Sequence, residues 1–458
     1  QLDGRNIDVK AKAVHARGGF RYLQPANDEP WLGILAGIST DDGSQAWRYF
    51  PENLMGKDLV DYLSGAIQGG EADNATLVYG GNPQLFPYKH NEGQFEVLVP
   101  LRNAKFAFQP DWPALTNLDI ELDFINDGLW MKTDGVNLGG VRASNLTAVI
   151  PDYSKEKLLI DADIKGPGKA VGPYFDETPL KDSLGATLQE LQLDGDVNAR
   201  LHLDIPLNGE LVTAKGEVTL RNNSLFIKPL DSTLKNLSGK FSFINGDLQS
   251  EPLTASWFNQ PLNVDFSTKE GAKAYQVAVN LNGNWQPAKT GVLPEAVNEA
   301  LSGSVAWDGK VGIELPYHAG ATYNVELNGD LKNVSSHLPS PLAKPAGEPL
   351  PVNVKVDGNL NSFELTGQAG ADNHFNSRWL LGQKLTLDRA IWAADSKTLP
   401  PLPEQSGVEL NMPPMNGAEW LALFQKGAAE SVGGAASFPQ HITLRTPMLS
   451  LGNQQWNN

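Results

Sequence analysis

The sequence of 458 residues contains no cysteine, and this absence excludes disulfide bonds, thiolate metal sites and cysteine nucleophiles. It also has no long apolar run: the stretch WLGILAGI at residues 31–38 is far shorter than the ~18–20 residues of a membrane-spanning helix. Because it begins with Gln1 rather than Met, the sequence is compatible with an excised piece whose membrane anchor or targeting signal lies elsewhere.

Positive charge is scarce. The chain has 36 Lys and Arg residues against 53 Asp and Glu residues, a net charge of −17, and its basic residues form no long cluster. Nucleic acids and anionic headgroups attract proteins through clustered basic side chains. The composition therefore disfavours nucleic acid as a partner and disfavours electrostatic attraction to anionic lipid headgroups.

Signatures of catalysis and metal binding are also missing. No pair among the seven histidines has the HExxH spacing, and no serine stands in a GxSxG motif. The stretch DGDVN at 194–198 begins like a calcium loop, but Ala199 stands where an EF-hand needs Gly. We therefore expect no catalytic residue, no metal and no cofactor; an enzyme whose carboxylate pair comes from distant loops is the less favoured alternative.

Glycine, proline and turn dipeptides are abundant. The chain has 45 Gly and 31 Pro, and Asn-Gly or Asp-Gly pairs recur between short segments in which apolar and polar residues alternate. Such pairs accept the positive φ angles of tight hairpins, and the alternation is typical of strands with one apolar and one polar face. The sequence predicts a mainly β protein: a long, curved and twisted antiparallel sheet with a few short amphipathic helices.

One strand motif occurs twice. Residues 117–129 (NLDIELDFINDGL) and 236–248 (NLSGKFSFINGDL) agree at six of thirteen positions over an offset of 236 − 117 = 119. A weaker similarity joins 193–207 to 301–317. We interpret these similarities as a decayed repeat of about 110–120 residues, in which the repeated unit is a strand with its turn.

Few segments have helical periodicity. Residues 56–69 and 416–431 are amphipathic, and the first is expected either to pack on the sheet, which we favour, or to cover it as a lid. The Pro-rich stretches 337–351 and 398–407 are expected to be extended loops. We predict three segments of one continuous groove, at residues 1–190, 191–336 and 337–458.

The eleven tryptophans include Trp307, which shares the alternating phase of Val305. Packing at scattered positions in the core is favoured over a sugar-stacking platform for these residues.

The apolar face of the strands needs a cover, and two solutions fit. Pairs of sheets can close on one another as tandem β-sandwich modules for binding, adhesion or scaffolding, or one curved sheet can keep its face for an apolar ligand. In the second case the in-phase residues line a lipid-binding groove: Leu118, Ile120, Leu122, Phe124, Leu201, Leu203, Ile205, Phe241, Phe243, Val277, Val279, Leu281, Val325, Leu327, Val354 and Val356.

Two stretches carry a resemblance to a known family. Residues 48–97, with Pro51, Gly70, Gly80 and the FPY run at 86–88, resemble the AsmA-like family, and residues 111–131 (DWPALTNLDIELDFINDGLWM) continue the resemblance. The family's motifs are structural, so no catalytic residue carries over.

The resemblance implies a repeating β-groove of the bridge-like lipid transfer proteins. It implies a periplasmic location in Gram-negative bacteria, an inner-membrane anchor outside these residues, and movement of phospholipid from the inner to the outer membrane in support of the outer-membrane barrier. Phospholipids would be the ligands, with further outer-membrane or envelope protein partners possible at the ends.

Overall fold

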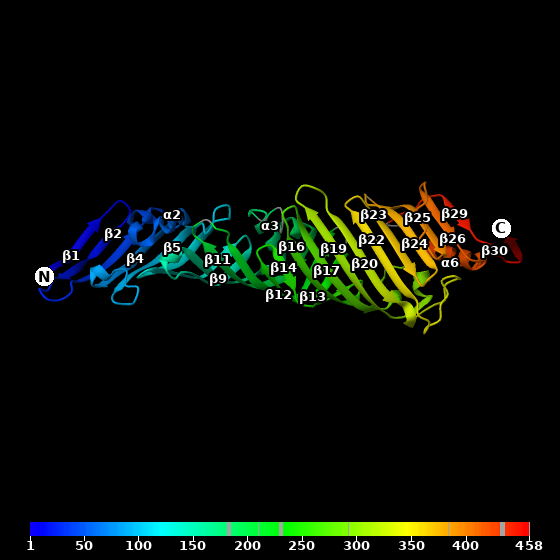
Figure 1. Cartoon of the computed structure of the whole chain (residues 1–458), viewed down its shortest axis with the longest axis horizontal. Helices are drawn as coiled ribbons and strands as arrows, with labels where there is room; N and C mark the ends of the chain where they lie inside the picture. Colours follow the sequence, from blue (N-terminus) through cyan, green and yellow to red (C-terminus); the bar gives the residue numbers. More distant parts are fainter. Residues whose placement is uncertain are drawn as a thin grey trace. The chain divides into compact units, whose positions relative to one another are not determined.

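The computed structural model describes residues 1–179, 181, 185–208, 210–228, 232–291, 293–382, 384–430 and 436–457. The chain divides into two compact units. Unit 1 comprises Gln1–Leu220 and Phe241–Gly246, and unit 2 comprises Arg221–Lys240 and Asp247–Asn458. Strands predominate in both units, which confirms the predicted mainly β fold (Figure 1). In the described chain, no helix has both the length and the apolar character needed to cross a membrane.

The strands of unit 1 pair antiparallel, each with the next, from β1 to β9, and β9 then pairs with β11 and β11 with β12. Their bounds are β1 (Leu2–Lys10), β2 (His15–Leu23), β3 (Trp31–Thr40), β4 (Ile67–Gly81), β5 (Gln94–Phe106), β6 (Leu115–Ile125), β7 (Gly128–Leu138), β8 (Val141–Ile150), β9 (Lys157–Pro167), β10 (Leu191–Asp194), β11 (Asp196–Pro206) and β12 (Thr213–Ile227), of which the residues from Arg221 belong to unit 2.

Short helices interrupt this series. The connection between β3 and β4 carries η1 (Gly43–Tyr49), α1 (Glu52–Met55) and α2 (Lys57–Ala66), so the predicted helix at 56–69 is confirmed. The others in unit 1 are η2 (Pro83–Leu85), η3 (Tyr153–Lys155), η4 (Gly168–Ala170), α3 (Val171–Phe175) and α4 (Ala186–Glu190). In Figure 1 α2 lies alongside the strands of this unit.

Unit 2 also consists mainly of antiparallel strands. An antiparallel series runs from β15 through β16, β17, β19, β20, β22, β23 and β24 to β25. Strand β13 (Ser232–Ile244) belongs to unit 2 up to Lys240 and to unit 1 from Phe241. The other strands are β14 (Asp247–Ser250), β15 (Leu253–Trp257), β16 (Gln260–Glu270), β17 (Ala274–Trp285), β18 (Leu301–Gly303), β19 (Val305–Pro316), β20 (Thr322–Asp330), β21 (Val334–Ser336), β22 (Pro351–Asn359), β23 (Ser362–Ala369), β24 (Asn373–Leu380) and β25 (Leu385–Ala394). The helices are η7 (Pro287–Lys289), α5 (Glu295–Asn298), η8 (Leu331–Asn333) and α6 (Gly417–Glu430), and α6 confirms the prediction at 416–431.

The carboxy-terminal strands depart from the predicted antiparallel order. They are β26 (Gly407–Asn411), β27 (Met415–Asn416), β28 (Ala436–Ser437), β29 (Ile442–Arg445), β30 (Met448–Leu451) and β31 (Gln454–Asn457). β26 pairs parallel with β25, and β29 pairs parallel with β26. A parallel neighbour needs a crossover rather than a hairpin, and the Pro-rich stretch 398–407, which has no helix or strand before Gly407, supplies it.

Asparagines with positive φ angles recur at the offset of the repeat. Asn126 and Asn245, which are 119 residues apart, both have positive φ angles, of 51° and 53°. Asn126 Oδ1 accepts a hydrogen bond of 2.9 Å from the Phe95 amide, and Asn245 Oδ1 accepts one of 2.8 Å from the Ala214 amide. Asparagine tolerates the left-handed conformation because its short side chain can bond nearby backbone.

A second pair of asparagines, outside the motif, keeps the same offset. Asn103 and Asn222 have φ angles of 50° and 54° and are again 119 residues apart. The Asn103 amide donates to Asp119 Oδ1 at 3.1 Å, and the Asn222 amide donates to Ser238 Oγ at 2.9 Å. Asn103 lies at a register shift between β5 and β6, and a bulge there bends the strand and increases its local twist. The proposed division into 1–190, 191–336 and 337–458 stays a prediction.

Candidate apolar binding site

Alternation gives unit 1 one apolar face, which we call the unit 1 apolar face. Across successive strands Leu77 lies opposite Val97, Val97 opposite Phe124, and Phe124 opposite Leu129. Of the predicted groove residues, those on β6 all lie on this face and are buried, from 1% exposed at Leu118 to 9% at Phe124. They form the core of unit 1.

Helix α2 covers part of this face. Leu59 and Leu63 have no exposed surface and belong to the same cluster of buried residues as Leu118 and Ile120. These two leucines and Val60 share one side of the helix, as the amphipathic pattern predicts. Helix α2 is therefore a packing element, and Ile120 lies beneath protein rather than at an open surface.

The segment before α2 encloses a cavity. Residues 43–56, which contain η1 and α1 and which we call the strap, contribute Ala46, Phe50 and Leu54 to the walls of a cavity of about 480 Å³. The opposite wall consists of in-phase residues of β3 to β6: Ile38, Ala75, Leu77, Phe95, Val97, Val99, Leu101, Leu122 and Phe124. The volume of the cavity falls within the ~300–1,000 Å³ of small-molecule sites.

The lining of this cavity carries almost no polar groups. The side chains with a hydroxyl are Thr40, Tyr49 and Tyr153, and the Tyr153 hydroxyl already donates to the Gly128 carbonyl at 2.7 Å. Burial raises the pKa of Tyr153, so this side chain stays neutral. The cavity offers nothing to hold a charged headgroup and suits a hydrocarbon chain.

The in-phase residues of unit 2 form a second face, which we call the unit 2 apolar face. One row runs from Val279 to Val311, Val325 and Val356 on adjacent strands. The next row runs from Leu281 to Gly309, Leu327 and Val354. The predicted residues Val277, Val279, Leu281, Val325, Leu327, Val354 and Val356 thus come together on one face, and all of them except Val277 are only half-buried.

The remaining predicted residues lie on β11 and β13. Leu201 and Leu203 are half-buried and Ile205 is buried, on the face that β11 shares with Leu158 and Ile160 of β9. Phe241 and Phe243 are half-buried, and the ring of Phe243 lies so close to Gly216 that a Cβ atom there would meet it at 2.7 Å.

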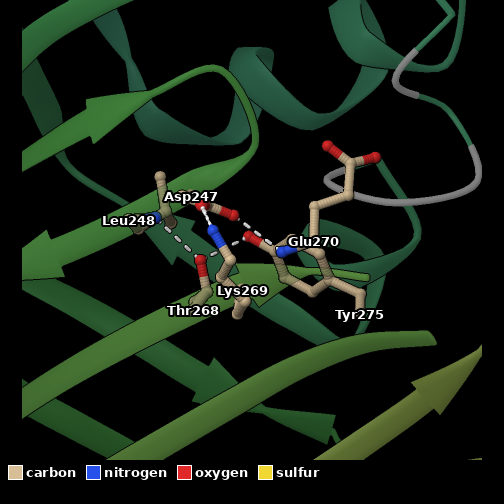
Figure 2. A network of polar contacts seen from close by, with 6 residues as sticks. All are labelled: Asp247, Leu248, Thr268, Lys269, Glu270 and Tyr275. Carbon is tan, nitrogen blue, oxygen red and sulfur yellow. Dashed lines mark hydrogen bonds and ion pairs between the residues drawn. The ribbon is translucent and has the colours of Figure 1, made fainter. Parts of the chain in front are cut away.

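Opposite ends of the unit 2 apolar face differ in chemistry. At one end Thr268 Oγ1 accepts hydrogen bonds from the Tyr275 hydroxyl at 2.7 Å and the Leu248 amide at 2.8 Å (Figure 2). Asp247 accepts from the Glu270 amide at 2.7 Å and pairs with Lys269 (Figure 2). Burial raises the pKa of Tyr275 to about 12. At this end polar groups of β14, β16 and β17 hydrogen-bond or form an ion pair with one another.

The pKa of Asp247 reflects opposing effects. Its partial burial acts to raise the pKa of this carboxyl, but the Lys269 ammonium and the Glu270 amide outweigh burial. The pKa therefore lies below its ordinary value of 3.8, and the carboxylate is charged at neutral pH.

At the other end lie four aromatic rings, those of Trp257, Phe258, Trp285 and Trp307. Trp257 stacks on Phe258 with 4.7 Å between ring centroids, and Trp285 contacts Trp307 edge to face at 4.7 Å. Trp257 Nε1 donates to Ser232 Oγ and Trp285 Nε1 donates to the Pro261 carbonyl, both at 2.7 Å. These tryptophans are clustered rather than scattered.

Sequence reasoning missed the strap and the whole of β5. The alternation of Phe95, Val97, Val99 and Leu101 on β5 was a readable signal. Nothing in the residues of the strap shows that they cover a sheet, because that depends on the path of the chain.

Among the described residues no group of three His, Asp or Glu side chains could hold a metal ion.

The comparisons agree with the resemblance. The profile described as "YhdP protein" matches residues 1–458. The "Intermembrane phospholipid transporter YhdP" of Escherichia coli (strain K12) is 99% identical over 458 residues, which are 100% of this chain and 36% of that protein. The chain thus spans about a third of the length of this relative. No solved structure matches the chain. The chain belongs to the YhdP family.

Proposed function

We propose that this chain holds the acyl chains of phospholipids on its apolar faces as part of a protein that moves phospholipid between membranes. The observation that carries the proposal is the unit 2 apolar face, where rows of aliphatic side chains such as Val279, Val311 and Val325 stay partly exposed. Contiguous exposed apolar surface marks a place where something apolar binds. The printed name of the YhdP relative supports the same activity.

The energetics explain why such a face is useful. Transfer of hydrocarbon into water costs about 0.8 kcal/mol per CH₂, so a two-chain phospholipid that leaves a bilayer through water faces a barrier of roughly 20–25 kcal/mol. An apolar face that accepts both chains removes most of this barrier. Because the rows repeat the same aliphatic chemistry from strand to strand, they favour sliding over capture at one position.

The predicted lining residues have different parts in this proposal. Contact with lipid is proposed for the half-buried residues of β11, β13, β17, β20 and β22, and for Leu122 and Phe124 at the cavity wall. Leu118, Ile120 and Ile205 are assigned to packing, since they are buried and do not line the cavity.

The wider setting is proposed from the family. The chain would work in the periplasm as part of a bridge anchored to the inner membrane by residues outside this chain. Transport would run from the inner to the outer membrane, in support of the permeability barrier, with envelope proteins as partners at the ends. Nothing in the proposal requires catalysis or nucleic acid.

The first test asks what the chain carries. The purified chain, kept free of detergent, is extracted with organic solvent, and the extract is analysed by mass spectrometry beside an acidic control protein taken through the same steps. Several phospholipids per chain with mixed headgroups support the proposal. An extract without lipid favours the alternative, a binding or scaffold module of the envelope.

The cavity under the strap has its own test. Ala46→Trp places an indole in the cavity, and we expect it to reduce the lipid bound in unit 1 while the far-ultraviolet circular dichroism stays unchanged. Ala26→Trp, at an exposed position of the same unit, is the matched control. Unchanged lipid binding by the Ala46 variant would show that the cavity is only a packing defect.

A further inference from the structure

The indole nitrogen of Trp307 differs from the other donors of its cluster. Trp257 and Trp285 donate their N–H groups to protein oxygens, whereas Trp307 Nε1 is buried and has no hydrogen-bond acceptor among the described residues. Its edge-to-face contact with Trp285 offers at most a weak interaction with the ring face. A buried donor without an acceptor is uncommon and points to a missing partner.

The position of Trp307 is at the apolar face itself. It lies opposite Gly283 on β17 and Gly329 on β20, at the end of the aliphatic rows. Its ring bends over its own strand, since a Cβ atom at Gly309 would meet ring atom Cζ3 at 3.3 Å. A Cβ atom at Gly283 would meet the Trp285 indole at 2.8 Å, and one at Gly329 would meet Val305 Cγ2 at 3.3 Å, so apolar side chains occupy the space over these two glycines.

The surroundings decide which acceptor fits. The in-phase neighbours of Trp307 are Gly283 and Gly329 across the ladders and Val305 and Gly309 along the strand, and none is charged. A phosphate placed here would lack a counter-ion, which makes its burial unfavourable. A neutral carbonyl oxygen has no such requirement, and it is the acceptor that a diacyl lipid carries next to its chains.

The backbone beside the cluster is held in an unusual conformation. Phe258 has a φ of +46°, which is rare for a bulky residue, and its ring contacts both Trp257 and Trp285. Phe258 and Asn259, whose φ is +58°, are the two central residues of the hairpin between β15 and β16, a turn with positive φ angles at both positions. Here it holds a wall of rings beside the free N–H group.

We infer that Trp307 is the residue that binds the ester region of a phospholipid, by donating its indole N–H to an ester carbonyl oxygen. The inference rests on the proposed function and adds the position of the polar part of the lipid. The chains then lie along the aliphatic rows from Trp307 toward Val311, and the headgroup lies beyond the cluster of rings.

Indole-selective NMR tests this inference. The chain is labelled with ¹⁵N in its eleven tryptophans, and the signal that disappears in Trp307→Phe is assigned to Trp307. Vesicles of diacyl phosphatidylethanolamine are compared with vesicles of its dialkyl ether analogue, which lacks the carbonyl. We expect the diacyl lipid to move the Trp307 signal downfield and to half-saturate it at about three- to tenfold lower concentration than the ether lipid, the range of one hydrogen bond.

Two variants separate the N–H group from the ring. Trp285→Phe removes an N–H that already has an acceptor within the protein, so it should keep the preference for the diacyl lipid. Trp307→Phe, followed through the Trp285 signal, should lose that preference. Equal titration by both lipids in the parent chain, or a preference that survives in Trp307→Phe, overturns the inference. Failure of either lipid to move any indole signal would instead contradict the proposed function.

Discussion

The two units present the same alternation of residues but differ in what covers it. In unit 1, Leu118 and Ile120 are 1% and 6% exposed beneath α2. In unit 2, Val279 and Val325 occupy in-phase positions on their strands and stay partly exposed. The difference shows that a strand pattern specifies an apolar face without specifying its occupant.

The cause of the difference is one connection. Between β3 and β4 the chain inserts the strap and α2, which lie against the unit 1 apolar face. In unit 2 the connections β16 to β17, β19 to β20 and β22 to β23 contain no helix, and the helix α5 between β17 and β19 packs against α6 and β18. A tight hairpin leaves the face of its strands uncovered, whereas a helical insertion can cover it.

A charge on each face should have the largest and most unequal effect. Ile120→Lys buries an ammonium without a partner, and we expect a loss of about 4 kcal/mol or more in the free energy of unfolding of unit 1. Val279→Lys leaves the ammonium near water, so its loss should stay under about 1 kcal/mol while lipid binding falls. Urea unfolding followed by circular dichroism measures both, and equal losses would refute the comparison.

Removal of the cover should make unit 1 resemble unit 2. Leu63→Ala deletes a fully buried side chain of α2, with an expected loss of about 2–5 kcal/mol in unfolding free energy. Asp58→Ala, at an exposed position of the same helix, is the control. We expect only the first variant to increase binding of an apolar fluorescent dye; no difference in dye binding would argue that the strap alone covers the face.

The repeated asparagines give a smaller effect that compares the two copies of the motif. Asn126→Ala loses a hydrogen bond and strains a left-handed residue, for a loss of about 1–3 kcal/mol. Asn245→Ala should lose less because Asn245 is exposed. Glycine tolerates a positive φ angle, so Asn126→Gly and Asn245→Gly should lose only the stability that comes from the side-chain hydrogen bond. Thermal unfolding measures both losses of stability. A larger loss for Asn245→Ala than for Asn126→Ala would contradict this prediction.

The smallest effect is expected at Asp247, in the network of Figure 2. Because its pKa is lowered in the folded state, its contribution to stability is present above its ordinary value of 3.8 and is lost as the pH falls through the folded pKa. Asp247→Asn should therefore lower stability at pH 7, by under about 1 kcal/mol for this partly exposed ion pair. The gap between parent and variant should close on acidification below pH 4, and a gap that widens there would contradict this assignment.

Much of the fold could be predicted from the sequence, since period-two alternation places residues such as Val279 and Val356 on one face whatever the sheet's wider shape. The parallel pairing of β25 with β26 could not, because the Pro-rich stretch before Gly407 is compatible with either a hairpin loop or a crossover. Ile120 looked like a lining residue because no local pattern shows that α2 packs over it. The free N–H of Trp307 depends on which acceptors the fold brings near, and that is not encoded locally.

One measurement tests the central claim most directly. A photo-crosslinking amino acid is placed in turn at Val279, on the unit 2 apolar face, and at Ala278, its exposed neighbour on the opposite face of β17. After illumination in cells, mass spectrometry should find phospholipid attached at position 279 and not at 278. Equal labelling of the two positions, or no lipid at 279, would contradict the account of this face as a surface for acyl chains.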